Sequence, residues 1–195
     1  MQKIEPIPYH KATHLVVDIE TLGITIPTPI LSLGYVILDF ANQVSSPVTT
    51  GCIQFDPLQC AGHPETSSVL WWRQQSAAAQ YAAFEQTPDA NPLGMFENLF
   101  KCYRFDYLWG KSPDFDFGHM EAQLKAAGHK VPWNFWQLRD IRTVEGFGIE
   151  YRGLNPIFEE LKFLAAQHET AHSALDDAIH EAKMLCGAVV QIAGL

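Results

Sequence analysis

The hydrophobic positions near the start of the chain follow the short runs that are typical of buried β-strands. HLVVDIE at 14–20 opens with an apolar run of the length that suits a buried strand. ILSLGYVILDF at 30–40 is rich in β-branched and aromatic residues, and VTTGCIQFD at 48–56 alternates roughly in polarity. Turn-forming residues separate these last two runs, which is typical of a hairpin. The pattern therefore predicts three early strands, the second and third forming a meander.

From residue 63 onward the pattern changes to that of helices alternating with short strands. Segment 63–86 supplies helix formers with Pro64 and Ser/Thr caps near its start, and 92–105 has apolar residues at helical spacing. The later elements that we expect are strand 106–110, helix 115–128 ending at Gly128, strand 134–140, helix 155–167 and helix 174–192. This order predicts an α/β fold, with a mixed sheet flanked by helices.

Length and composition predict one globular domain, residues 1–195. The chain is 47% hydrophobic and 18% charged, and 195 residues suffice for one sizeable core. No apolar run approaches the roughly 18 residues of a membrane span, and MQKIEPIPYH lacks the apolar core of a secretory signal.

The cysteines indicate the redox environment of the protein, and the net charge limits how it could approach nucleic acid. The four cysteines, at 52, 60, 102 and 186, lie too far apart for a metal knuckle or a disulfide framework. We therefore expect a reducing, cytoplasmic setting. The net charge of −9 argues against attraction of nucleic acid to the whole surface, so a polyanion would have to approach one face.

Two acidic residues, Asp18 and Glu20, end the first predicted strand. Side chains alternate along a strand, so D-x-E places both carboxylates on one face. Their apolar neighbours predict partial burial, in which two carboxylates repel each other and lose hydration. A hard cation with oxygen ligands would relieve both costs. The alternative interpretation is a pair of surface acids at a strand end.

A third acid, Asp116, follows the short strand that ends at Gly110 and lies near a helix start, in WGKSPDFDFGHMEA. In open α/β sheets, ligand sites gather at strand ends of this kind. Asp114 lies two residues earlier and competes for the same role. Either acid is also expected at a helix N-terminus simply because it suits the helix dipole.

The segment HETAHSALDDAIHEAK at 168–183 has two interpretations, and the first is a zinc peptidase site. His168 and His172 fit H-E-x-x-H, which needs both histidines on one helix and a third ligand. Extended forms of the motif supply the third ligand as a His or Asp six residues after the second histidine, but position 178 is alanine. A glutamate from a later helix is the other source, but only Glu181 follows, and it lies on the same segment. Ser173 with Asp176 also forms an S-x-x-D capping box, which would start the helix after His172.

In the second interpretation, residues 172–178 form H-x-A-x-x-D-A. His172 lies on the connection into the last helix, where an exposed imidazole suits proton transfer from water. Asp177 lies in the first turns of that helix and faces inward with Ala174 and Ala178. The alternative is a surface loop histidine and an acid that suits the helix dipole.

The three motifs together, in this order, resemble those of the DEDDh 3′–5′ exonucleases of the ribonuclease H-like superfamily. The resemblance runs from Asp18 to Asp177. DIETLG, WWRQQS and WGKSPDFD are most similar to the branch that contains phage exonuclease A, exodeoxyribonuclease VIII-like proteins and a mycobacterial exoribonuclease. This resemblance implies a ribonuclease H-like fold and hydrolysis of the terminal phosphodiester at the 3′ end of single-stranded DNA or RNA, which releases nucleoside 5′-monophosphates.

The resemblance also implies roles for individual residues. Two divalent cations, Mg²⁺ or Mn²⁺, would be held by four carboxylates: Asp18, Glu20, Asp116 and Asp177. His172 would be the general base. Thr21 and Leu22 would lie under the 3′-terminal nucleotide, with Leu22 either a wedge against the last base or part of the core. A homodimer is a further expectation, because several relatives are dimers.

Some residues depart from this pattern or lie outside it. Ser112-Pro113 stands where the branch has a glycine, which affects the loop before Asp116. Trp71 and Trp72 are candidates to stack on a base, with core packing as the alternative. His119 and His180 are expected on helix surfaces. The competing functions are a zinc metallopeptidase that uses HETAH and a non-catalytic, nucleic-acid-binding ribonuclease H-like module.

Overall fold

The fold is a five-stranded mixed sheet with helices on both faces. The computed structural model describes residues 7–42, 47–144, 146 and 171–193. The strand order is β3-β2-β1-β4-β5; the first two pairs are antiparallel, and the β1–β4 and β4–β5 pairs are parallel. The strands are β1 (Thr13–Thr21), β2 (Ile30–Asp39), β3 (Thr49–Gln54), β4 (Tyr107–Gly110) and β5 (Leu138–Asp140). The predicted mixed sheet, with its meander first, is confirmed.

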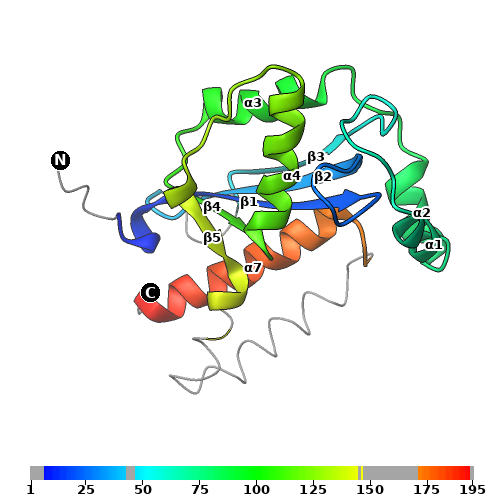
Figure 1. Ribbon diagram of the computed structural model, residues 1–195. Helices are drawn as coiled ribbons and strands as arrows, with labels where there is room; N and C mark the ends of the chain where they lie inside the picture. The colour runs from blue at the N-terminus through cyan, green and yellow to red at the C-terminus, as the bar shows by residue number, and fades with distance from the viewer. Residues whose placement is uncertain (1–6, 43–46, 145, 147–170, 194–195) are drawn as a thin grey trace.

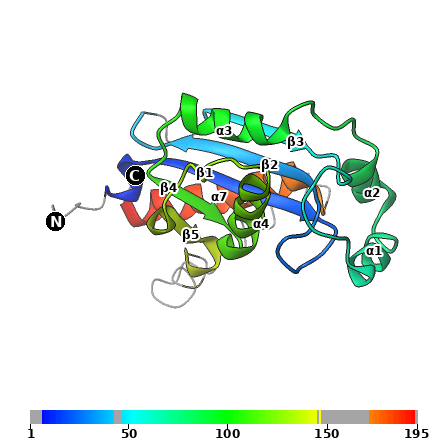
Figure 2. The same cartoon turned by 45° about the horizontal axis from the view of Figure 1, so that its top comes forward.

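Helices cover the two faces unequally. The helices are α1 (Thr66–Trp72), α2 (Ala77–Phe84), α3 (Pro92–Cys102), α4 (Pro113–Ala126) and α7 (Ala174–Ala193), with short 3₁₀ turns η1 (Tyr9–Lys11) and η2 (Phe135–Gln137). Figures 1 and 2 show α3 and α4 on one face of the sheet and α7 on the other. Helices α1 and α2 lie beyond the end toward which β1 points.

The alternation of side chains along β1 divides the core in two. Leu15 and Val17 are fully buried on the face that α3 and α4 cover, with Phe96 and Met120. Full burial of each such side chain contributes roughly 1.5–3 kcal/mol. Val16 packs on the other face, against Ala178, Ala182 and Leu185 of α7. Since Asp18 and Glu20 alternate in step with Val16, they belong to the α7 face, as D-x-E predicts.

Three predicted elements differ from the structure. Segment 63–86 forms two helices rather than one, because the Ser76 side chain accepts a hydrogen bond from the amide of Ala79 and starts α2. Segment 134–140 begins as η2, so only its last three residues form a strand. Helix α4 begins at Pro113, two residues before the predicted start, with proline in its first turn.

The remaining elements are confirmed or lie outside the described residues. The strands predicted at 14–20, 30–40, 48–56 and 106–110 and the helices at 92–105 and 174–192 are present within a few residues of their expected bounds. The helix predicted at 155–167 lies outside the described residues. Of the helices in the described segments, none combines the length with the hydropathy that a bilayer-spanning helix needs.

Candidate active site

The carboxyl end of β1 carries the first two acids of the site. Asp18 pairs in register with Gly34 of β2, and Glu20 pairs with Ser32. The register shifts between Glu20 and Thr21, and irregularities of this kind re-aim side chains at the ends of strands. Because β1 lies between β2 and β4, both acids are fixed to the centre of the sheet.

The two candidates for the third acid, Asp116 and Asp114, differ in burial. Asp116 is only 4% exposed, and its carboxylate lies so close to Gly110 at the end of β4 that a side chain there would collide with it. Asp114, by contrast, is exposed. The two acids share the first turn of α4, and only Asp116 points toward β1, where its charge raises the pKa of Asp18.

The loop before α4 keeps a glycine-like conformation without a glycine. Ser112 has a φ of 94°, in the left-handed region that glycine favours. Its Oγ accepts a hydrogen bond from the Arg142 guanidinium. Ser112 therefore adopts a backbone conformation that glycine favours, and Asp116 reaches the end of β4.

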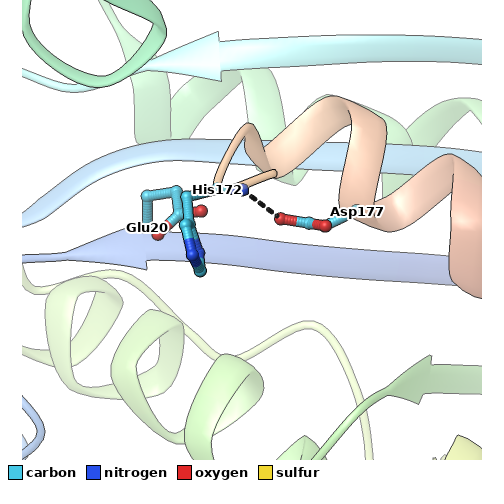
Figure 3. Close-up of side chains that lie close together, drawn as sticks. All are labelled: Glu20, His172 and Asp177. Atoms are coloured by element: carbon cyan, nitrogen blue, oxygen red, sulfur yellow. Dashed lines mark hydrogen bonds between the residues drawn. The ribbon is translucent and has the colours of Figure 1, made fainter. Parts of the chain in front are cut away.

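His172 and Asp177 approach from α7. The His172 amide donates to Oδ2 of Asp177 at 3.1 Å, and ligand atoms of His172, Asp177 and Glu20 all lie within 4.8 Å of one another. Figure 3 shows Glu20 on β1 beside these two residues at the start of α7. The second interpretation of 168–183 thus describes this part of the molecule.

The zinc-peptidase interpretation fails on backbone geometry. H-E-x-x-H needs a continuous helix through its second histidine, but His172 has a φ of 65° and lies in a turn. Helix α7 begins only at Ala174, directly after Ser173, as the S-x-x-D box predicts. His168 lies outside the described residues.

Gly34 brings α7 close to the sheet, and the sequence analysis missed it. A side chain at Gly34 would collide with the main chain of Ala174 and Leu175. Because Gly34 is the register partner of Asp18, its missing side chain lets the first turn of α7 rest on β2 beside that acid. A glycine inside an otherwise apolar strand was the available signal, since it often marks a close approach of another backbone.

The site concentrates negative charge in a buried place. Burial, followed by the charges of Asp116, Glu181, Glu20 and Asp177, raises the pKa of Asp18 well above its ordinary value. Burial and the charges of Asp177 and Asp116 raise the pKa of Glu20 to about 8. Burial also raises the pKa of Asp116 to about 7, although a backbone hydrogen bond from Ile19 and the charge of Arg142 lower it. Such crowding is relieved by a bound cation.

Glu181 is a further acid at the site that the sequence analysis did not assign to it. It is buried on α7, four residues and so about one turn after Asp177, and its charge contributes to the raised pKa of Asp18. The i, i+4 spacing from Asp177 was the signal that could have found it, because such residues share one helix face.

The expected substrate-contacting residues have mixed surroundings. Thr21 is half-buried, and its hydroxyl donates to the carbonyl of Gly23. Leu22 is 8% exposed and packs with Leu31 and Trp72, which favours the core interpretation over the wedge. Trp72 is also core, and its Nε1 donates to the Thr21 carbonyl at 2.9 Å. Trp71, by contrast, is 41% exposed.

The two histidines that were expected on helix surfaces are not alike. His119 is fully buried, so that prediction was wrong. It lies on the inner face of α4 with its ring 4.6 Å from that of Phe115, and the neighbouring Gly118 lies against Ile26 of the loop after β1. His180 is half-buried on α7.

The sheet order and the flanking helices are those of the ribonuclease H-like fold. The chain matches the Rv2179c-like 3′–5′ exoribonuclease domain over residues 13–188 and belongs to that family. The predicted relationship to the DEDDh 3′–5′ exonucleases is confirmed. Among curated proteins, no sequence matches the chain.

Solved structures agree with this fold. E. coli ExoI in its zinc-bound complex with single-stranded DNA is 16% identical, with a TM-score of 0.65 over 94% of this chain and 41% of that chain. The nuclease domain of 3′hExo, a DEDDh family member bound to rAMP, is 13% identical, with a TM-score of 0.58 over 96% and 95% of the two chains. Cell-death related nuclease 4 (CRN-4) is 16% identical, with a TM-score of 0.60 over 92% and 63%.

At these identities the likeness shows the fold. The chain spans 41% of the length of ExoI and 63% of that of CRN-4, but nearly all of the 3′hExo nuclease domain. The expected homodimer has no support from the comparisons.

Proposed function

We propose that the protein hydrolyses the terminal phosphodiester bond at the 3′ end of a single-stranded nucleic acid and releases nucleoside 5′-monophosphates. One observation carries the proposal: carboxylates from β1, α4 and α7 meet a histidine at one end of the sheet. RNA is the foremost substrate, because the family is described as an exoribonuclease domain. Among similar structures, ExoI is in complex with single-stranded DNA, and a 3′-exonuclease recognises the 3′ end of a histone mRNA stem-loop.

Asp18, Glu20, Asp116 and Asp177 would hold two divalent cations. The fit is supported by the donor set, which is all oxygen, and by the raised pKa values of the first three acids. Such oxygen donors suit Mg²⁺ or Mn²⁺. When bound, the ions supply charge stabilisation to the attacking and leaving oxygens of the displacement.

His172 is the general base. Its imidazole lies beside Glu20 on a turn, where it takes a proton from the attacking water. The water oxygen forms the new bond to phosphorus, and the bond from phosphorus to the 3′ oxygen of the preceding nucleotide breaks. The products are a nucleoside 5′-monophosphate and a strand shortened by one residue, which keeps a 3′-hydroxyl.

Thr21 and Leu22 border the terminal nucleotide. Thr21 ends β1 directly after Glu20, and Leu22 follows it. The buried Leu22 supports the site from beneath rather than as an exposed wedge. Trp72 holds this stretch in place through its hydrogen bond to the Thr21 carbonyl.

Residues 1–195 act as one catalytic domain in the reducing setting of the cytoplasm. The family match to residues 13–188 supports the single domain. All four cysteines are free thiols, and none of them lies in the acid cluster, so the chemistry does not depend on them.

Matched RNA and DNA oligonucleotides of one sequence, labelled at the 5′ end, test the proposal. With Mn²⁺ or Mg²⁺, we expect a ladder of products shortened from the 3′ end, no products on a 3′-blocked oligonucleotide, and no activity in EDTA. An Asp18→Ala protein purified in parallel is the control for a contaminating nuclease. Internal cleavage, or equal activity of the Asp18→Ala protein, would contradict the proposed function.

A further inference from the structure

The imidazole of His172 lies against two tryptophans of α1. The ring centroids of Trp71 and His172 are 4.7 Å apart with an interplanar angle of 79°, an edge-to-face arrangement that is favourable for aromatic pairs. The Trp72 ring lies 6.4 Å from His172 at the same angle. A helix far from His172 in the sequence therefore supplies the neighbours of the proposed base.

The two tryptophans are not equivalent, because only one is anchored in the core. Trp72 is 2% exposed, donates to the Thr21 carbonyl and packs against Phe84 at 5.3 Å. Trp71 packs edge-to-face on Trp72 at 5.1 Å. The rings form a chain from the end of β1 through Trp72 and Trp71 to His172.

Trp71 contributes little to the core. Its side chain is 41% exposed. The buried cluster around Trp72 consists of other residues: Leu22, Leu31, Ala79 and Ala83. Helix α1 is only seven residues long, and its exposed face includes Leu70 at 50%. A half-exposed indole at this position is explained by what it touches, which is the ring of His172.

His172 needs such support because its backbone position does not fix its ring. The residue lies in a turn with a φ of 65°. The hydrogen bond from its amide to Asp177 constrains the main chain but not the imidazole ring. Side-chain torsions then decide whether the imidazole faces Glu20 or turns toward solvent. A large flat neighbour on one side restricts those torsions.

We infer that Trp71 is a positioning residue for His172, holding the imidazole toward Glu20 and Asp177 through edge-to-face contact. The inference rests on the proposed function, since it assigns Trp71 a part in the work of the base. Loss of the indole lets the imidazole sample other rotamers and lowers the fraction of molecules that are ready to react. From the usual strength of aromatic pairs, Trp71→Ala lowers kcat by about threefold to tenfold.

A double-mutant cycle tests the inference, with kcat and KM measured in wild-type and His172→Ala backgrounds. If Trp71 acts through His172, Trp71→Ala lowers kcat in the first background and changes it by less than about twofold in the second. Trp71→Phe, which keeps a flat ring, retains most of the activity. Leu70→Ala is the matched control on the same helix and leaves kcat unchanged.

An NMR measurement supplies a readout that is independent of turnover. The indole ring current shifts the ring-proton resonances of His172, so Trp71→Ala moves them toward random-coil positions, and Leu70→Ala does not. Equal losses of kcat in both backgrounds, a rise in KM alone, or unmoved His172 resonances would overturn the inference. An inactive wild-type protein would instead overturn the proposed function, so the two failures are distinguishable.

Discussion

The two ends of β1 both bury ionisable side chains on the α7 face of the sheet, yet they differ in how those groups are satisfied. At the amino end, His14 is fully buried. Its Nδ1 accepts from Nε1 of Trp109 at 2.8 Å, and its Nε2 lies 2.9 Å from the Tyr9 carbonyl. Burial lowers the pKa of His14 to about 4, so it is neutral near pH 7 and both ring nitrogens are satisfied within the protein.

At the carboxyl end, the buried groups are alike in charge. Asp18 and Glu20 face Asp116 and Asp177, and each raises the pKa of a neighbour. Burial of an ionisable group therefore does not by itself mark a functional site. A cluster of like charges whose members raise one another's pKa values is the better indication, because a bound cation relieves their repulsion.

The largest expected effect comes from removing one acid of the cluster. Asp18→Asn should lower kcat by at least about 10³-fold, since the ion-dependent stabilisation it supports is worth several kcal/mol. The same change should raise the free energy of unfolding in EDTA, because it removes a buried charge from a repulsive set. Single-turnover kinetics and urea denaturation measure the two effects. A less stable and fully active Asp18→Asn protein would contradict this account of the carboxyl end.

The next effect separates the base from the metal ligands. His172→Ala should lower kcat by about 10²-fold, within the usual contribution of a general base, and leave Mn²⁺ affinity nearly unchanged. Calorimetric titration with Mn²⁺ provides the comparison. An equal loss of metal affinity would instead make His172 a ligand, in line with its closeness to Glu20 and Asp177.

The two ends of β1 also predict that the free energy of unfolding depends on pH with opposite signs. Glu20 and Asp116 have raised pKa values, about 8 and about 7, so their stabilising contribution is complete below their ordinary values and is lost as the pH rises through 7 to 8. His14 has a lowered pKa of about 4, so stability is lost as the pH falls from 6.5 toward 4.

Urea denaturation from pH 4 to 9 in EDTA should therefore show the greatest free energy of unfolding at the acidic end of this range, because between pH 4.5 and 6.5 the two acids lose more than His14 gains. Added Mg²⁺ should remove the loss at alkaline pH, because it binds the ionised carboxylates of the folded state, and leave the contribution of His14 unchanged. Parallel curves with and without Mg²⁺ at alkaline pH would show that the acids do not bind the ion.

A smaller effect, confined to stability, is expected at the amino end. His14→Phe leaves the Trp109 indole N–H and the Tyr9 carbonyl without their partner, which should lower the free energy of unfolding by about 1–3 kcal/mol. The kcat of the folded protein should not change. A large loss of kcat in a folded His14→Phe protein would mean that the two ends are coupled.

The smallest effect is expected from the exposed acid on α4. Asp114→Ala should change kcat less than about twofold and stability by less than about 0.5 kcal/mol, whereas Asp116→Ala should remove activity. The pair compares two acids in one helical turn that differ in burial. Loss of activity in Asp114→Ala would reverse the assignment of the third acid.

The sequence predicted the fold and the acid set because strand and helix periods are local signals. D-x-E fixes a shared face by alternation alone, and Ser173 marks the start of α7. The choice between Asp114 and Asp116 depended on which of them meets Gly110, a contact between β4 and α4. The effects of Gly34 and Glu181 depend on how close α7 lies to the sheet. The burial of His119 depends on how α4 packs in the fold. Such long-range contacts have no period along the chain.

Counting bound ions tests the central claim most directly. Wild-type protein titrated with Mn²⁺ at pH 7, in the presence of a nucleoside 5′-monophosphate, should bind two ions per chain. It should also release protons, because the pKa of Glu20 is raised to about 8 in the absence of metal. Asp18→Asn should lose at least one of the two ions. Absence of binding at millimolar Mn²⁺, or the same stoichiometry and affinity in Asp18→Asn, would contradict the account.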